Sequence, residues 1–287
     1  MARNREKIPS LVYQVQKALD EKLAIGESKH LDKLKGITKD KIYSWETYRS
    51  YMKHCNYFTK FCKQTYGCKT IEQCRPYIDE WLESRTKKKL SAYTQKLEAS
   101  ALAKMYGCST KDFIKTDARN RSNITRSRGE KVRDKHFSEE RNKELVEFCK
   151  STGLRRAELK ALTGDKLIEK NGEYYIKVDS GSKGGRYRES PIIGNVEFVV
   201  NRMKSVEKNK VFEKVPVGAD IHSYRSEYCT SIYNANERDI KTLKPSERYC
   251  CRKDLKGTWY DRNAMLIASK ALGHNRISII AEHYIRG

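Results

Sequence analysis

Five residues in the second half of the chain have types and spacings that suit phosphodiester chemistry. Arg155 follows a Thr-Gly-Leu turn, His222 and Arg225 are spaced i, i+3, and His274 precedes Tyr284 by ten residues. Arginine forks clamp phosphate oxygens, imidazoles transfer protons, and a tyrosine hydroxyl can act as a nucleophile. Together these groups could break and rejoin a phosphodiester without a metal ion or ATP.

A sixth residue, Lys183, lies in the glycine-rich segment 181–185 between two predicted strands. The segment lacks the G-x-x-x-x-G-K-[ST] spacing of a P-loop, and no helix follows it. A hairpin tip of this kind can deliver an ammonium group to a leaving oxygen. A solvated lysine in a glycine turn explains the loop equally well when it is considered alone.

Each of these signals is weak when it is taken alone. Glu158 lies three residues after Arg155, where its carboxylate can hold the guanidinium on one helical face, yet a surface ion pair is the simpler interpretation. The H-x-x-R pattern recurs by chance, and a tyrosine such as Tyr284 ordinarily packs in a core. Only the combination of these residues in one chain points to a specific chemistry.

The composition points to a polyanionic partner. The 287-residue chain has 60 Lys and Arg against 37 Asp and Glu, a net charge of +23. Such an excess favours nucleic acid as the partner and binding that weakens with salt, although it could also serve only solubility. No apolar run has the roughly 20 residues that a membrane span needs, and no signal peptide is evident. We therefore expect a cytoplasmic, nucleoid-associated protein that does not bind membranes.

Nine cysteines in a chain without a secretion signal are not expected to form disulfides. Cys55, Cys62, Cys68 and Cys74 cluster beside His54, but no Cys-x-x-Cys pair typical of zinc sites is present. We expect reduced, mostly buried thiols and no bound metal.

The first 115 residues or so read as helices. The pattern predicts one helix from a Ser10 cap to Gly26, a second after a Ser44 cap, and two more over 76–85 and 88–106. The aromatic residues of this part follow helical spacing, which favours a core over base-stacking platforms, and the interleaved lysines could contact phosphates.

A basic segment separates this helical part from the rest. Residues 115–135 hold eight Lys and Arg against three acids, which predicts an exposed linker that either follows a DNA backbone or serves only as a solvated tether. The DNA-binding candidates in it are Arg119, Arg121, Arg126, Arg128, Lys131 and Arg133.

The remaining residues predict a mixed structure. We expect a helix from Phe137 through Cys149, another near Leu154, strands over 173–178 and 188–193, and a helix after Asp220. A small hairpin is predicted from 249–252 and 258–260, followed by an amphipathic stretch that carries Tyr284.

Taken in order, these motifs resemble the tyrosine recombinase family, which includes the integrases and resolvases of phages, conjugative elements and chromosomes. The resemblance covers about residues 136–287 and consists of the Thr-Gly-Leu-Arg turn, the hairpin lysine, H-x-x-R, Leu-Gly-His and the late tyrosine. The helical first part resembles the family's core-binding domain only in position, charge and helix content.

The resemblance implies a fold that is mainly α with a small β-sheet and hairpin. The implied domains are a helical core-type DNA-binding domain over 1–118, a basic linker over 119–135, and an α+β catalytic domain over 136–287. The segment between His222 and His274 is longer than usual and could contact DNA, contact a protomer or act as a flap. Ser226 replaces a frequent histidine, His283 allows another register for the last helix, and only three residues follow Tyr284, where many relatives carry a further segment.

The resemblance also implies roles for the residues. Arg155, supported by Glu158, and Arg225 would clamp the phosphate with His274, while His222 would assist proton transfer from Tyr284. Lys183 would protonate the leaving 5′ oxygen. The product would be a 3′-phosphotyrosine, and the reaction would need no cofactor.

The implied partner is double-stranded DNA. The protein would be a monomer when free and a homo-tetramer on paired sites, with accessory DNA-bending proteins as possible partners. The sequence leaves two alternatives open: a related breaking-and-joining enzyme of the resolvase or topoisomerase type, and a DNA-binding regulator without catalytic activity. A metal-dependent nuclease is disfavoured, because no clustered carboxylate and histidine ligands are evident.

Overall fold

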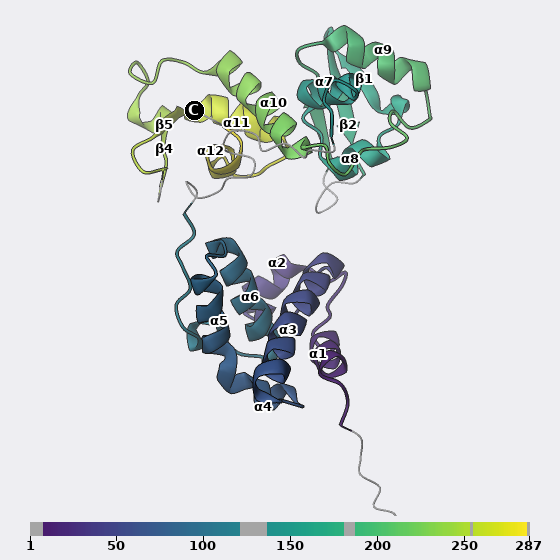
Figure 1. Cartoon of the computed structure of the whole chain (residues 1–287). Helices are drawn as coiled ribbons and strands as arrows, with labels where there is room; N and C mark the ends of the chain where they lie inside the picture. The colour runs from purple at the N-terminus through teal and green to yellow at the C-terminus, as the bar shows by residue number, and fades with distance from the viewer. Residues whose placement is uncertain (1–7, 121–136, 181–186, 253–254, 286–287) are drawn as a thin grey trace, which may run out of the picture. The chain divides into compact units, whose positions relative to one another are not determined.

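A computed structural model describes residues 8–120, 137–180, 187–252 and 255–285 (Figure 1). The chain divides into two compact units, Met1–Asn123 and Ile124–Gly287, here called unit 1 and unit 2. The described residues form mainly helices with two small antiparallel sheets, which confirms the predicted fold class. Within these ranges, no helix combines the length and apolar character needed to cross a bilayer.

Unit 1 is helical. Its helices are α1 (Leu11–Asp20), α2 (Lys29–Leu34), α3 (Trp45–Tyr66), α4 (Ile71–Cys74), α5 (Ile78–Lys87) and α6 (Ala92–Met105). Ser10 and Ser44 cap α1 and α3 as predicted, each accepting a hydrogen bond from the backbone N–H three residues on. Val15, Phe58 and Leu102 lie in the core of this unit and are fully buried, in agreement with helices that pack through one apolar face.

The predicted end of the first helix at Gly26 is wrong, because α1 ends at Asp20. The chain then pairs with a distant segment: the Ile42 N–H donates to the Lys22 carbonyl at 2.7 Å, and the Ala24 N–H donates to the Ile42 carbonyl at 2.9 Å. Ala24 and Ile42 are both buried. A non-local backbone pairing therefore replaces the last turns that the local pattern suggested.

The nine cysteines are free thiols, and seven of them are buried, in agreement with the prediction of mostly buried thiols. Among the residues that the structure describes, no group of three or more His, Cys, Asp or Glu side chains is arranged to hold a metal ion.

Unit 2 has two parts (Figure 1). The first holds α7 (Lys143–Thr152), α8 (Arg156–Ala161), α9 (Val196–Val206) and an antiparallel sheet of β1 (Leu167–Lys170), β2 (Glu173–Val178) and β3 (Arg188–Pro191), in that order. The second holds α10 (Ile221–Asn236), α11 (Arg262–Ala271), α12 (Ser278–His283) and the hairpin of β4 (Arg248–Cys250) and β5 (Trp259–Asp261). Each part has its own hydrophobic core.

The hairpins of unit 2 are partly as predicted. Strand β2 and the hairpin β4–β5 are confirmed, the latter with Tyr249 opposite Tyr260. Strand β1 is an addition that the sequence analysis lacks. It is joined to β2 by Asn171 and Gly172, whose φ angles of 52° and 77° are those of a tight hairpin turn.

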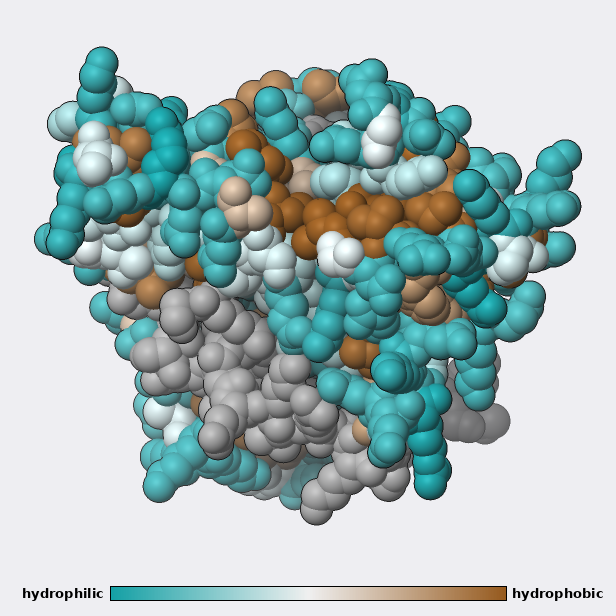
Figure 2. Space-filling model, turned by 90° about the horizontal axis from the view of Figure 1, so that it is seen from above, coloured by the Kyte–Doolittle hydropathy of each residue, from teal (hydrophilic) through white to brown (hydrophobic). Residues whose placement is uncertain are grey.

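The surface agrees with the charge of the chain. Among the described residues in Figure 2, hydrophilic side chains predominate, with hydrophobic residues gathered in a band near the middle of the view and in smaller patches elsewhere.

Candidate active site

Arg155 is fixed at the start of α8 by a carboxylate. It is the residue before the helix, and its backbone N–H donates to Glu158 Oε2 at 2.7 Å. Its guanidinium Nη1 donates to Glu158 Oε1 at 2.8 Å. Glu158 therefore holds both the backbone and the side chain of Arg155, and about a quarter of that side chain is exposed to solvent (26%).

Arg225 lies on α10, a helix that begins after Asp220 as predicted, and is 2% exposed. Its Nη2 donates to the Leu272 carbonyl at 2.5 Å, its Nη1 donates to the Gly153 carbonyl, and its Nε donates to the Tyr284 hydroxyl at 3.3 Å. Burial lowers the pKa of Arg225 to about 10, so the guanidinium keeps its charge at neutral pH.

The carbonyl of Leu272 is shared by the two arginines. Besides Arg225, it accepts a longer hydrogen bond of 3.4 Å from Arg155 Nη2. Leu272 is the C-cap of α11, where carbonyl groups lacking helical partners attract cations. The C-terminal end of α11 therefore holds the guanidinium groups of Arg155 and Arg225 close together.

Tyr284, directly after α12, lies beside these arginines and is 6% exposed. Its hydroxyl is 3.1 Å from His274 Nε2, and the ring centroid of His222 is 5.2 Å from that of the tyrosine. Burial lowers the pKa of His274 to about 4, and the charges of Arg225 and Arg155 add to this effect. His274 is therefore a neutral imidazole at neutral pH and can accept a proton.

These groups line one open cavity of about 320 Å³. Its walls are Arg155, Arg156, Ala219, Asp220, Ile221, His222, Arg225 and Tyr284. His222 is exposed there, whereas Arg225 and Tyr284 form the buried side. The lining of this open cavity therefore includes two fixed cations, a tyrosine and one imidazole, and the second imidazole, His274, is hydrogen-bonded to the tyrosine.

Arg188, the first residue of β3, is a member of the cluster that the sequence analysis missed. Its Nη1 and Nη2 donate to the two oxygens of Glu158 at 2.8 and 2.7 Å. Burial raises the pKa of the Glu158 carboxyl, but the hydrogen bonds from Arg188 and Arg155 outweigh it and lower the pKa to about 2. Arg188 and Ser190 are the buried residues in the alternating pattern of β3. An arginine at an inward-facing strand position was therefore the sequence signal that could have identified Arg188 as part of the site.

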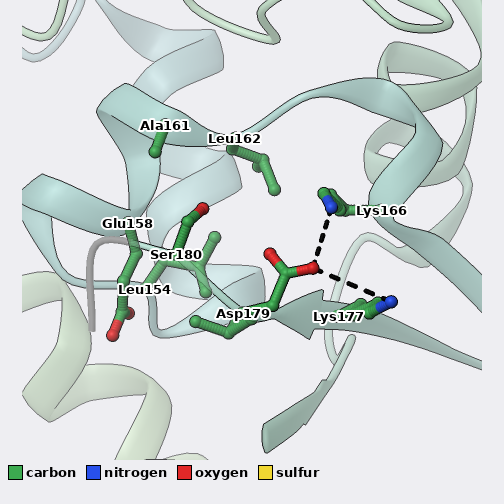
Figure 3. A pocket seen from close by; sticks show the side chains of 9 residues that line it. Leu154, Glu158, Ala161, Leu162, Lys166, Lys177, Asp179 and Ser180 are labelled. Atoms are coloured by element: carbon green, nitrogen blue, oxygen red, sulfur yellow. Dashed lines mark hydrogen bonds and ion pairs between the residues drawn. The ribbon is translucent and has the colours of Figure 1, made fainter. Parts of the chain in front are cut away.

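A second carboxylate residue, Asp179, lines a small pocket that Glu158 also lines (Figure 3). Asp179, after β2, forms ion pairs with Lys166 at 2.8 Å and with Lys177 at 3.7 Å. Figure 3 shows the Glu158 carboxylate pointing away from this group. Lys166, directly before β1, and Lys177 on β2 therefore neutralise Asp179, whereas Glu158 is neutralised by arginine.

Several predicted residues lie outside the described residues, namely Lys183, Arg121, Arg126, Arg128, Lys131 and Arg133. Arg119 is described: it is exposed, and its guanidinium lies 5.2 Å from the ring centroid of Tyr93 in unit 1. His283 is about half exposed, at 3.9 Å from Glu282, so it is Tyr284 that faces the arginines in this register.

The comparison with solved structures identifies the fold. The chain matches the XerH site-specific recombinase bound to a palindromic difH substrate in a post-cleavage complex, with a TM-score of 0.54 over 99% of this chain and 95% of that one, at 15% identity. The chain has the tyrosine recombinase fold. It also matches the pre-cleavage complex of XerH, at a TM-score of 0.49 and 14% identity over 99% and 96% of the two chains.

A further match to this recombinase fold is the Tn1549 transposon integrase in complex with transposon right-end DNA, at a TM-score of 0.43 and 15% identity over 97% of this chain and 96% of that one. No family model and no curated protein sequence matches the chain.

Proposed function

We propose that the protein is a site-specific DNA recombinase of the integrase type that cleaves DNA through Tyr284. The observation that carries this proposal is the Tyr284 hydroxyl, which is hydrogen-bonded to both Arg225 Nε and His274 Nε2 at the wall of an open cavity. A tyrosine that serves only packing has no need of two cations and two imidazoles around it.

In the proposed reaction, Tyr284 Oη attacks the phosphorus and the bond to the 5′ oxygen breaks. The phenol proton passes to a histidine, and the leaving oxygen takes up a proton to become a 5′-hydroxyl. The protein keeps a 3′-phosphotyrosine ester. Because this ester conserves the energy of the broken bond, attack by a 5′-hydroxyl of the partner strand rejoins DNA without ATP.

The hydrogen bond at Tyr284 favours His274 as the group that takes the phenol proton. His274 is neutral at neutral pH and 3.1 Å from the hydroxyl, while His222 lies at the exposed side of the cavity, where a phosphate would enter. This exchanges the roles that the family resemblance implies for the two histidines. The Arg225 contact to the same oxygen would stabilise the phenolate as it forms.

Arg155 and Arg225 would hold the non-bridging oxygens of the phosphate. Both are fixed before DNA arrives, by Glu158 and by the end of α11, so little reorganisation is needed in the transition state. Loss of one such donor is expected to reduce the cleavage rate about 100- to 1,000-fold. Lys183 stays a prediction as the acid for the leaving oxygen.

Double-stranded DNA is the proposed partner, supported by the net charge of +23 and by the substrate-bound complex of XerH, a solved protein with this fold. We further propose a homo-tetramer on two paired sites, with the basic segment 119–135 along the DNA backbone. Accessory DNA-bending proteins would assist that assembly.

The experiment uses nicked duplexes taken from the DNA that flanks the gene, incubated with the wild type and with Tyr284→Phe. A protein–DNA adduct that resists denaturant is expected with the wild type and not with Tyr284→Phe. Tyr175→Phe is the matched control, because its hydroxyl contacts Glu173 on the sheet, outside the cavity lining, and it should form the adduct. Retarded DNA without any adduct would contradict the proposal and favour a DNA-binding regulator.

A further inference from the structure

Arg188 is a buried arginine that lies behind the cavity rather than in its wall. It is 8% exposed, and the residues that line the cavity do not include it. Both of its Nη groups donate to Glu158, and the side chain is buried and lies outside the cavity lining, so it is not placed to bind a phosphate there. Its contribution to the site must therefore pass through Glu158 and through the other residues that it contacts.

The charges around Glu158 explain why a second arginine is needed. Without Arg188, the buried carboxylate would face Arg155 alone, and the two charges would cancel just where a phosphate has to bind. With Arg188 as its bidentate partner, Glu158 takes one hydrogen bond from the Arg155 guanidinium, whose Nη2 has only a 3.4 Å contact to the Leu272 carbonyl. Two arginines and one carboxylate leave one net positive charge, on the side that faces the cavity.

Arg188 also packs against the turn that carries His274. Gly273 has a φ of +69°, and a Cβ added there would lie 2.6 Å from Arg188 Cδ and 3.3 Å from its Nε. The arginine therefore fills the space that the absent side chain leaves. One side chain thus contacts both Glu158, which holds Arg155, and the backbone immediately before His274.

We propose that Arg188 is a positioning residue for DNA cleavage, which neutralises Glu158 so that Arg155 stays available to the phosphate and which supports the turn before His274. This rests on the proposed function. Arg188 acts through its neighbours and does not touch the DNA.

The test measures adduct formation in single turnover at saturating nicked duplex. Arg188→Met is expected to lower the rate about 100-fold while the Kd for DNA changes little, since misplacement of a reacting group by about 1 Å has that effect. Arg188→Lys keeps the charge but not the two-pronged hydrogen bonding, so its rate of adduct formation should lie between those of the wild type and Arg188→Met. Arg202→Met is the matched control: its guanidinium donates to the Val211 carbonyl and lies 5.6 Å from the Phe212 ring centroid, outside the cavity lining.

A double substitution separates charge compensation from a structural role. In Glu158→Gln/Arg188→Met the carboxylate and its extra cation are both gone, so Arg155 keeps its charge, and we expect at least about 10-fold recovery over Arg188→Met alone. A double variant that is slower than either single variant would overturn the proposal, as would an unchanged rate in Arg188→Met. If Arg188→Met does not fold, Arg188→Lys and the double variant carry the test.

A second measurement tests the role of Arg188 even if the wild type forms no adduct. That result would contradict the proposed function itself. The pKa of His274 in the free protein can be followed by NMR. The charged and titratable groups that face this imidazole are Arg155, Arg188, Arg225, His283 and Tyr284. Loss of the Arg188 charge should raise the pKa of His274, and Arg202→Met should not change it. An unchanged pKa in Arg188→Met would show that Arg188 does not act on the site.

Discussion

Among the described residues, each unit buries one glutamate beside arginine side chains, and the two groups differ in their bonding. Glu158 in unit 2 and Glu98 in unit 1 are both 3% exposed. Glu158 accepts hydrogen bonds from two guanidinium groups and a backbone N–H, all at 2.7–2.8 Å. Glu98 has His54 at 3.3 Å and Arg85 at 3.9 Å, and its Oε2 has no hydrogen-bond partner among the described residues.

The difference shows that residue types alone do not make an active site. Arg85 lies flat on Trp81, with its Cζ 3.6 Å from the ring centroid, and the group is packed within a helical core. Around Glu158 two guanidinium groups are held by short hydrogen bonds, and Arg155, one of the two, lines an open cavity together with Tyr284. Fixed donors that face solvent are what a phosphate requires.

The largest expected difference is in stability. Glu158→Gln leaves Arg188 buried without a counter-charge and should lower the free energy of unfolding by about 3 to 5 kcal/mol. Glu98→Gln breaks no short hydrogen bond and should cost about 1 kcal/mol. Urea denaturation at pH 7 measures both, and equal costs would remove the distinction between the two groups.

Arginine replacement should separate the groups by reaction rate. Arg225→Lys keeps a charge but cannot reach the Leu272 carbonyl and the Tyr284 hydroxyl together, so adduct formation should slow about 100- to 1,000-fold. Arg85→Lys should leave the rate at saturating DNA within about twofold, because packing on Trp81 is not part of the reaction. A slow Arg85→Lys would mean that the buried group of unit 1 also serves cleavage.

Acid should destabilise the protein through Glu158. The folded pKa of about 2 lies below the ordinary value of 4.5. The stabilisation is therefore complete above pH 4.5 and is lost as the pH falls from 4.5 to 2, by about 3 kcal/mol. The lowered pKa of His274 acts in the same direction between pH 6.5 and about 4. Unfolding free energies measured across this range should fall less steeply in Glu158→Gln; an identical slope would show that Glu158 is not held as described.

We expect the smallest difference between two glycines that have the same backbone conformation. Gly273 and Gly67 have φ angles of +69° and +68°, but an added Cβ meets Arg188 at Gly273 and nothing within 4 Å at Gly67. Gly67→Ala should cost about 1 kcal/mol for the left-handed backbone. Gly273→Ala should cost about 1 to 3 kcal/mol more for overpacking, and should also slow adduct formation. Thermal unfolding measures the loss of stability in each variant, and adduct assays measure the rate. Equal stability losses would contradict the packing of Arg188 on this turn.

The sequence predicts those parts of the site that are set by local spacing. His222 and Arg225 share one helix because Asp220 caps it, and Arg155 and Glu158 meet because they are three residues apart at a helix start. The Asn171-Gly172 pair also carried a local signal, for the turn between β1 and β2, and could have been used.

Contacts between distant segments could not be predicted in this way. Arg188 and Glu158 are 30 residues apart, and nothing in the local pattern pairs a strand arginine with a helix glutamate. The hydrogen bond between Tyr284 and His274 depends on how α12 packs after α11. The end of α1 at Asp20 similarly depends on pairing with Ile42, which no helix signal contains.

Of the 18 tyrosines in the chain, we propose that Tyr284 is the nucleophile. The most direct measurement isolates the wild-type protein–DNA adduct, digests it with protease and nuclease, and locates the nucleotide-bearing residue by mass spectrometry. We predict a single modified peptide with the nucleotide on Tyr284, attached through a 3′-phosphate. A nucleotide on another tyrosine, on a serine, or through a 5′-phosphate would contradict the account.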